Sequence, residues 1–138
     1  MDIIIQKCIG EVAQLFGYGI VTFTTRLTVE VQGMPYEKTE DFRVYIAKEC
    51  VETRGTGSKV RQVVSCKGTT CQYGLIDTFE LLQKIYIRFY KSYAKVKLPH
   101  KFKIGVGGCT NNCVMPDLND LGIIGQYILN FDEDLCNG

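Results

Sequence analysis

The order of apolar and polar residues predicts a chain in which helices and strands alternate. Residues 3–16 carry apolar side chains at three- and four-residue spacings, which is typical of a helix with one buried face. That face comprises Ile5, Cys8, Ile9, Val12, Leu15 and Phe16. From residue 20 to 31 the pattern becomes strict alternation, which predicts one strand with Arg26 among threonines on its polar face. A second helix is expected over residues 39–50.

A polar, glycine-rich stretch at residues 52–59 is the best internal boundary, and it divides the chain into domains 1–58 and 59–138. In the second domain we expect a strand over 60–65, a long helix over 74–93, and strands over 101–106 and 122–131. The long helix carries an apolar stripe that we expect to lie in the core: Leu75, Phe79, Leu82, Tyr86, Phe89 and Tyr93. In the first domain, the helix–strand–helix order is typical of half of an α/β sandwich.

Two short cysteine pairs follow the first and second predicted strands of this domain. They are Cys66-Lys-Gly-Thr-Thr-Cys71 and Cys109-Thr-Asn-Asn-Cys113, and Gly107-Gly108 immediately precedes the second. Four thiolates at such spacings suit one inorganic centre, and glycine lets the backbone approach it closely. Structural zinc sites use similar spacings, so the cysteines alone leave zinc and iron–sulfur both open.

Composition narrows the classes of function. The formal charge of +1 over 138 residues disfavours nucleic-acid binding, and the apolar runs are far shorter than a membrane span. The count of seven cysteines is odd and no export signal is recognised, so we expect reduced thiols and a cytoplasmic location rather than a disulfide framework. Cys8 and Cys50 are expected to be small buried residues of helix faces.

Four basic residues are placed to bind an anion. Lys101 and Lys103 lie two apart on a predicted strand, so their ammonium groups leave the same face, and Arg61 begins the strand that ends at Cys66. Arg26 is the fourth. Guanidinium groups bind oxyanions through a fixed fork of donors, and lysine can also supply protons. His100 is interpreted as a surface or pocket-rim residue rather than a metal ligand.

Several motifs, in order, resemble the sulfite and nitrite reductase family that couples sirohaem to a [4Fe–4S] cluster. Residues 63–71 and 107–113 are similar to its paired cysteine signature, and Thr24-Thr-Arg26 is similar to its Thr-Thr-Arg element. Residues 98–103 resemble the segment with two substrate lysines, and residues 119–125 the strand after the last cysteine. The resemblance is strongest to the small, single-module type, exemplified by the catalytic subunit of anaerobic sulfite reductase.

The resemblance implies a sirohaem-dependent reductase of sulfite, with nitrite as the alternative substrate and electrons from a partner protein. It implies that Cys66, Cys71, Cys109 and Cys113 hold the cluster and that Cys113 also bridges to the sirohaem iron. Gly107, Gly108 and Asn111 would line the cofactor site. Arg26, Arg61, Lys101 and Lys103 would surround the anion. A homo-oligomer is expected, because a single module would complete its pocket by pairing.

The family fold implied is α+β, with a ferredoxin-like half-domain over 1–58 and a sirohaem and iron–sulfur domain over 59–138. By this resemblance the chain lacks the first strand of the half-domain and stops at the start of a ferredoxin-like insertion, whose first cysteine is Cys136. Two readings from other classes stay open: a zinc-stabilised structural module, and a non-catalytic relative that binds sirohaem or passes electrons.

Overall fold

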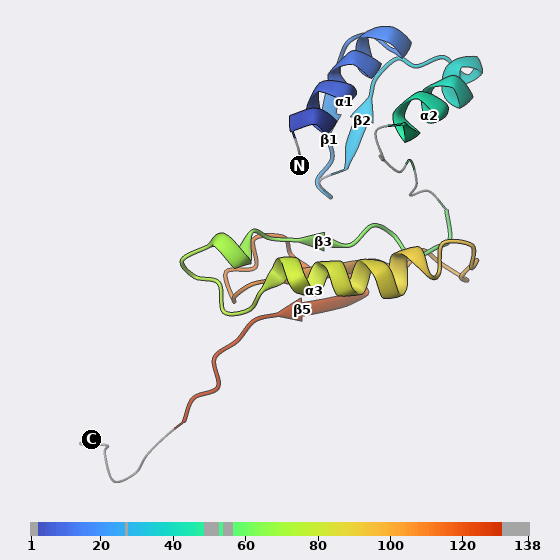
Figure 1. Cartoon of the computed structure of the whole chain (residues 1–138). Coiled ribbons are helices and arrows are strands. Elements are labelled where there is room, and N and C mark those ends of the chain that lie inside the picture. Colours follow the sequence, from blue (N-terminus) through green and yellow to red (C-terminus); the bar gives the residue numbers. More distant parts are fainter. Residues whose placement is uncertain (1–2, 27, 49–52, 54–56, 131–138) are drawn as a thin grey trace. The chain divides into compact units, whose positions relative to one another are not determined.

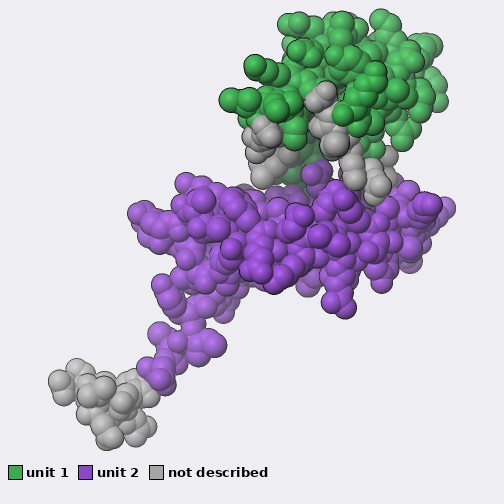
Figure 2. Space-filling model, in the orientation of Figure 1, with its two compact units in different colours: residues 1–55 green, residues 56–138 purple. Residues whose placement is uncertain are grey.

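The computed structural model describes residues 3–26, 28–48, 53 and 57–130. The chain forms two compact units, residues 1–55 and 56–138, which are coloured separately in Figure 2. Cys50 and Cys136, for which the sequence predicts a buried helix face and a second-cluster ligand, lie outside the described residues. In the described part of the chain, no helix is both long enough and apolar enough to cross a membrane.

The N-terminal unit packs two helices together beside a β-hairpin (Figure 1). Helix α1 (Ile3–Phe16) is confirmed over the predicted range, and α2 (Thr39–Ala47) follows the short 3-10 turn η1 (Tyr36–Lys38). The core joins Cys8 and Val12 of α1 to Ile46 of α2. Leu15, predicted to be buried, is 58% exposed, because Phe42 and Tyr45 of α2 pack against the neighbouring Phe16 instead.

The single strand predicted over residues 20–31 is wrong. The structure has two short antiparallel strands, β1 (Val21–Phe23) and β2 (Val29–Val31), paired from Val21–Val31 to Phe23–Val29. The chain turns because the Thr24 hydroxyl oxygen accepts the N–H groups of Arg26 and Thr28, both at 3.2 Å. A side chain that captures nearby backbone donors in this way competes with a continuous strand. Arg26 therefore lies in the turn and not on a strand face.

The C-terminal unit is built on a three-stranded parallel sheet in the order β3-β4-β5. The strands are β3 (Val64–Ser65), β4 (Ile104–Gly107) and β5 (Leu121–Ile124). β3 and β5 are shorter than predicted, and β4 begins later than predicted. The residues just before β3 and β4 are joined by the isolated pairing of Val60 with Phe102. After Ile124 the chain makes no further strand among the described residues, and the side chains from Tyr127 to Leu129 are at least 80% exposed.

One helical segment connects β3 to β4 and lies along the sheet (Figure 1). It begins with α3 (Thr78–Ile85) and continues as the π-helix η3 (Tyr86–Lys91). Shorter 3-10 turns, η2 (Gly68–Thr70) and η4 (Pro116–Leu118), lie in the loops after β3 and before β5. The core consists of Val63, Ile85, Ile104 and Val106, with Val60, Ile76, Leu81, Leu82 and Ile123 packed against them.

The aromatic stripe predicted to face this core is largely at the surface. Phe79 is 48% exposed, Phe89 38% and Tyr93 44%, whereas Tyr90 is only 6% exposed. For Phe89 and Tyr93 the cause is the change of helix type, because a π-helix bonds residues five apart rather than four and so has a longer repeat. Phe79 lies in the first turn of α3, before that change. The buried residues Ile85 and Tyr90 are spaced by that longer repeat. Beyond Ile85 the α-helical pattern therefore predicts the wrong buried face.

Candidate functional site

The basic residues and the cysteines of the C-terminal unit lie at opposite ends of its sheet. Where the strands begin, the Arg61 N–H donates to the Phe102 carbonyl at 2.7 Å. Where they end, the Cys66 N–H donates to the Val106 carbonyl at 3.0 Å. From Phe102 to Val106 the chain advances four residues, which is about 13 Å at about 3.3 Å per residue. Because the strands are parallel, both cysteine loops share the carboxyl end.

Three of the four predicted anion-binding residues line one hollow at the other end of the sheet. Arg61, Lys101 and Lys103 border a space of about 750 Å³ together with Gly57, Ser58, His100, Leu118 and Asp120. We call it the basic hollow. Asp120 accepts the backbone N–H of Lys103 at 2.7 Å, so one carboxylate lies among the cations. Three basic side chains against one carboxylate leave the hollow positive, which suits a small oxyanion.

Two further predicted residues are placed by the structure. His100 is exposed and borders the basic hollow, in agreement with the surface or rim position expected for it. Arg26 is half-buried in the hairpin turn of the N-terminal unit. Since the two units are described separately, Arg26 is not assigned to the basic hollow.

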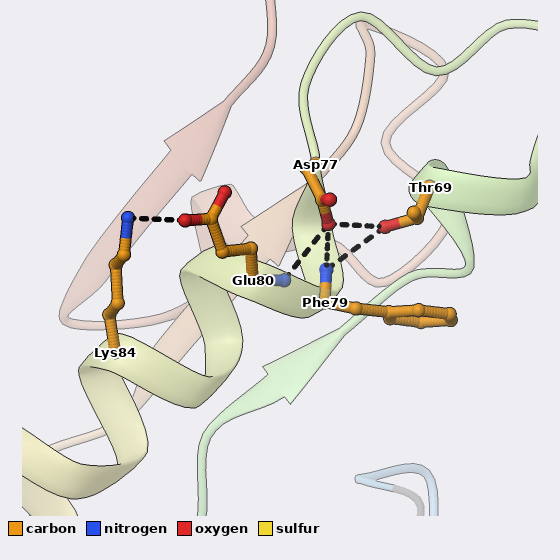
Figure 3. Close-up of polar contacts among 5 residues, drawn as sticks. All are labelled: Thr69, Asp77, Phe79, Glu80 and Lys84. Atoms are coloured by element: carbon orange, nitrogen blue, oxygen red, sulfur yellow. Dashed lines mark hydrogen bonds and ion pairs between the residues drawn. The ribbon is translucent and has the colours of Figure 1, made fainter.

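The first cysteine loop is tied to the start of α3. Cys66 follows directly after β3, and η2 leads to Cys71, whose N–H donates to the Gly68 carbonyl at 3.1 Å. Thr69 of η2 and Asp77, the N-cap of α3, are joined by a 2.8 Å hydrogen bond (Figure 3). Donation from the Glu80 N–H, and then from the Thr69 hydroxyl, lowers the pKa of Asp77 below its ordinary 3.8.

The second cysteine loop leaves β4 through the buried glycines Gly107 and Gly108. Between Cys109 and Cys113, Asn112 has φ of 56°, in the left-handed region that asparagine tolerates well. Its side-chain N–H₂ donates to Asp117 at 2.6 Å, while its Oδ1 is buried without a hydrogen-bond partner. Asn111 is exposed and, with Cys109, borders a second hollow of about 590 Å³.

The two cysteine loops are in direct contact. The Gly108 N–H donates to the Cys66 sulfur at 3.1 Å, and the Gly108 carbonyl accepts the Leu75 N–H at 2.9 Å. A Cβ atom on Gly68 would lie 2.9 Å from the Gly108 Cα, and one on Gly108 would lie 2.8 Å from the Gly68 Cα. Both positions therefore require glycine, and the contact brings the loops to a common edge of the unit.

These residues fit an iron–sulfur cluster in donor chemistry and backbone placement. All four thiols are free; Cys66, Cys71 and Cys109 are half-buried and Cys113 is exposed. An N–H donated to a cysteine sulfur is one of the hydrogen bonds that tune such clusters. Within the described ranges, however, no three His, Cys, Asp or Glu side chains are grouped as ligands of a metal ion. The two loops that carry the four thiols are adjacent.

Sequence reasoning missed the polar residues that support this arrangement, namely Thr69, Asp77, Thr78 and Asp120. One signal was available. Asp77 followed by Glu80 three residues later is the usual pattern of a helix N-terminus, and it would have placed the start of the helix at Thr78 instead of residue 74. Nothing in the sequence indicated that the same carboxylate also binds the cysteine loop.

Comparison with known proteins decides the family. Residues 56–128 match the model of the nitrite and sulphite reductase 4Fe-4S domain. The chain belongs to this family. Its fold, a mixture of helices and strands of the sulfite and nitrite reductase type, is confirmed by dissimilatory sulfite reductase I. That structure superposes with a TM-score of 0.72 at 22% identity, over 83% of this chain and 27% of the other.

Two curated relatives are sulfite reductases by name. The chain is 34% identical to coenzyme F420-dependent sulfite reductase of Methanocaldococcus jannaschii, over 86% of this chain and 18% of that protein. It is 29% identical to an anaerobic sulfite reductase subunit of Salmonella typhimurium, over 93% of this chain and 41% of that protein. The chain thus spans less than half the length of either relative.

Proposed function

We propose that this chain is a sirohaem-dependent reductase module that converts sulfite to sulfide, with electrons supplied by a partner protein. The observation that carries this is the basic hollow, in which Arg61, Lys101 and Lys103 meet in a member of a sulfite and nitrite reductase family. Cys66, Cys71, Cys109 and Cys113 would hold a [4Fe–4S] cluster, and Gly107, Gly108 and Asn111 would lie beside the cofactors. Nitrite, reduced to ammonia, is the alternative substrate, and the cytoplasm the expected location.

Each protein group has a specific task in this chemistry. Sirohaem, when bound, supplies the iron that takes up the anion and the path along which electrons reach it. The Arg61 guanidinium stays charged and holds oxyanion oxygens, and Arg26 is proposed to do the same. Lys101 and Lys103 stabilise the charge added on reduction and donate protons to the oxygens that leave as water. Their fixed placement spares the site the cost of reorienting solvent during each step.

The complete site is proposed to form between two copies of the chain. The basic hollow and the cysteine loops lie at opposite ends of one sheet, so a single C-terminal unit does not turn both toward one small anion. A second copy related by a twofold axis could place its hollow opposite the first copy's cysteines, and the converse would hold for the other site. A homo-oligomer therefore follows from the placement of the functional groups.

The cluster itself is proposed to complete the ligand set. The four side chains would reach the cluster from two loops that the Gly108 N–H to Cys66 sulfur bond holds together. Assembly would then stabilise the loops, because metal–thiolate bonds contribute directly to the folded state.

The test uses protein reconstituted anaerobically with iron, sulfide and sirohaem. The visible spectrum and the iron and acid-labile sulfide per chain establish the cofactors, and steady-state rates with sulfite and with nitrite establish the substrate. Lys101→Met and Lys103→Met should each lower the rate by about 10²-fold, as loss of a preorganised electrostatic group does, while cofactor content stays unchanged. Lys95→Met, which changes an exposed lysine outside the hollow, is the control.

Three results would contradict this function. A colourless protein that binds one zinc and assembles no cluster would indicate a structural module. Normal rates in both hollow variants would show that the anion is handled elsewhere, and normal cofactor binding with no rate for either anion would indicate a non-catalytic relative.

A further inference from the structure

Thr78 is the buried polar residue of the described chain, with no exposed surface. It is the first residue of α3, and it belongs neither to the cysteines nor to the basic hollow. Its hydroxyl donates to the Cys66 carbonyl at 3.1 Å and accepts the Thr69 N–H at 3.2 Å. One side chain thus holds both sides of the first cysteine loop.

The methyl group of Thr78 contacts both cysteine loops at their closest point. A Cβ on Gly68 would lie 2.6 Å from the Thr78 Cγ2, and a Cβ on Gly108 would lie 3.3 Å from it. The methyl therefore fills the space that the absent glycine side chains leave. Hydroxyl and methyl have separable roles: the first holds the backbone of one loop, and the second supports the contact between the two.

A second layer holds Thr69 in place. Its hydroxyl donates to Asp77 at 2.8 Å and accepts the Phe79 N–H at 3.0 Å (Figure 3). Asp77 also accepts the N–H groups of Phe79 and Glu80, at 3.0 and 2.9 Å. The neighbouring Thr70 offers a contrast, because its hydroxyl donates to the Lys67 carbonyl within its own turn.

We propose that Thr78 is a positioning residue for the iron–sulfur cluster. By fixing the Cys66 carbonyl and the Thr69 N–H, it keeps the Cys66 sulfur where the Gly108 N–H donates to it, and so sets the relative placement of the two cysteine loops. This role rests on the proposed function, since it presumes that the four thiols share one cluster. Loss of the hydroxyl should loosen the first loop and weaken the N–H to sulfur bond.

Two pairs of variants separate this role from simple packing. Thr78→Val keeps the shape and the methyl but removes the hydroxyl, whereas Thr78→Ser keeps the hydroxyl and removes the methyl. Thr69→Val and Thr70→Val change adjacent exposed threonines of one turn, of which Thr69 alone is bonded to Asp77 and Thr78. Thr70→Val is therefore the matched control.

The readouts are cluster loss to a chelator after anaerobic reconstitution and the reduction potential of the cluster. Thr78→Val should lose its cluster about tenfold faster than wild type, the scale expected for one or two lost hydrogen bonds. Its potential should become more negative, because a hydrogen bond to a ligand sulfur favours the reduced cluster. Thr69→Val should shift in the same direction by a smaller factor. Thr78→Ser should change less than Thr78→Val because it keeps both hydrogen bonds, and Thr70→Val should resemble wild type.

The cluster-free protein gives an independent measurement. Amide hydrogen exchange at Gly108 and Thr69 should be about tenfold faster in Thr78→Val, while exchange in the interior of β4 stays unchanged. If Thr78→Val does not fold, the comparison of Thr69→Val with Thr70→Val decides.

The outcomes distinguish the two proposals. A wild-type chain that assembles no cluster contradicts the proposed function, and the exchange rates then still report whether Thr78 positions the loop. A wild-type chain that assembles a cluster, with the same loss rate and potential in Thr78→Val, overturns the positioning role alone. The positioning role would also be overturned if Thr69→Val and Thr70→Val lost the cluster at the same rate. Equal rates of cluster loss in Thr78→Ser and Thr78→Val would overturn it as well.

Discussion

At the scale of single residues, the cysteine loops depend on small and polar side chains more than on the thiols themselves. Gly68 and Gly108 are required because their backbones touch, and Asp77 is required because three donors converge on one of its oxygens. None of these residues would bind a cofactor directly. They determine where the residues that do so are held.

Gly68→Ala should destabilise the C-terminal unit by about 1–3 kcal/mol, the usual cost of forcing an extra carbon into a packed site. The added Cβ would meet the Thr78 methyl at 2.6 Å and the Gly108 backbone at 2.9 Å. Chemical denaturation followed by circular dichroism measures the change. Gly10→Ala is the control, because nothing lies within 4 Å of its new Cβ and alanine favours a helix. Equal stability of Gly68→Ala and wild type would show that the loops are farther apart than described.

The Asp77 carboxylate should make stability depend on acidity. Its pKa is lower in the folded chain than the ordinary 3.8, chiefly because the Glu80 N–H binds the ionised form. Its stabilising contribution is therefore complete above the ordinary value and disappears as pH falls through the lowered one. Asp77→Asn should remove this part of the acid dependence, which thermal unfolding between pH 2 and 6 would measure (a range of about two units either side of the ordinary value). An unchanged acid profile in the variant would contradict the assigned cap.

At the scale of elements, the π-helix η3 decides which aromatic rings enter the core. Tyr90 is buried and stacks on Tyr86 with ring centroids 5.1 Å apart, while Phe89 stacks on Tyr93 at 6.3 Å on the exposed side. A regular α-helix would have carried Phe89 inward, as the sequence pattern predicts. The change from α-helix to π-helix after Ile85 thus buries Tyr90 in place of its neighbour Phe89.

Tyr90→Ala and Phe89→Ala test this exchange directly. Tyr90→Ala should cost about 3–5 kcal/mol of unfolding free energy because it opens a cavity beside the core. Phe89→Ala should cost about 1 kcal/mol, mainly the loss of its surface stacking partner. Denaturant midpoints of the two variants would be compared under the same conditions. If Phe89→Ala were instead the more destabilising variant, Phe89 rather than Tyr90 would be the buried ring. That result would support a regular α-helix and contradict the π-helix.

At the scale of the whole molecule, the separation of the basic hollow from the cysteine loops decides whether one chain can form a complete site. Both groups belong to one C-terminal unit, yet the sheet lies between them. A chain of this family could have all the functional residues and still be inactive as a monomer. Activity should therefore depend on protein concentration in the range where copies associate.

Mixing two inactive variants tests assembly between copies. One carries Lys101→Met with Lys103→Met, and the other carries Cys113→Ser. Random pairing in an equal mixture should restore about a quarter of the wild-type rate, since half the dimers are mixed and each has one intact site of two. A mixture as inactive as its components would show that one chain supplies both groups to each site.

The sequence by itself determined the family, the helix over residues 3–16 and the strand–helix–strand order of the C-terminal unit. These features are visible along the chain as a 3.6-residue period and as motifs in a fixed order. The sequence also indicated Arg61, Lys101 and Lys103 as a group, because they lie on the predicted strands that lead to the cysteine pairs. The parallel pairing of those strands came from the structure. The tertiary structure alone decided the rest. A threonine hydroxyl that captures two amides ended the long strand, a π-helix changed the buried face, and the length of the sheet placed bases and thiols at opposite ends. The strand break and the π-helix arise from local hydrogen bonds that override the alternating and 3.6-residue patterns, whereas the opposed ends depend on pairing of strands far apart in the sequence. The pattern of apolar and polar residues therefore predicted none of the three.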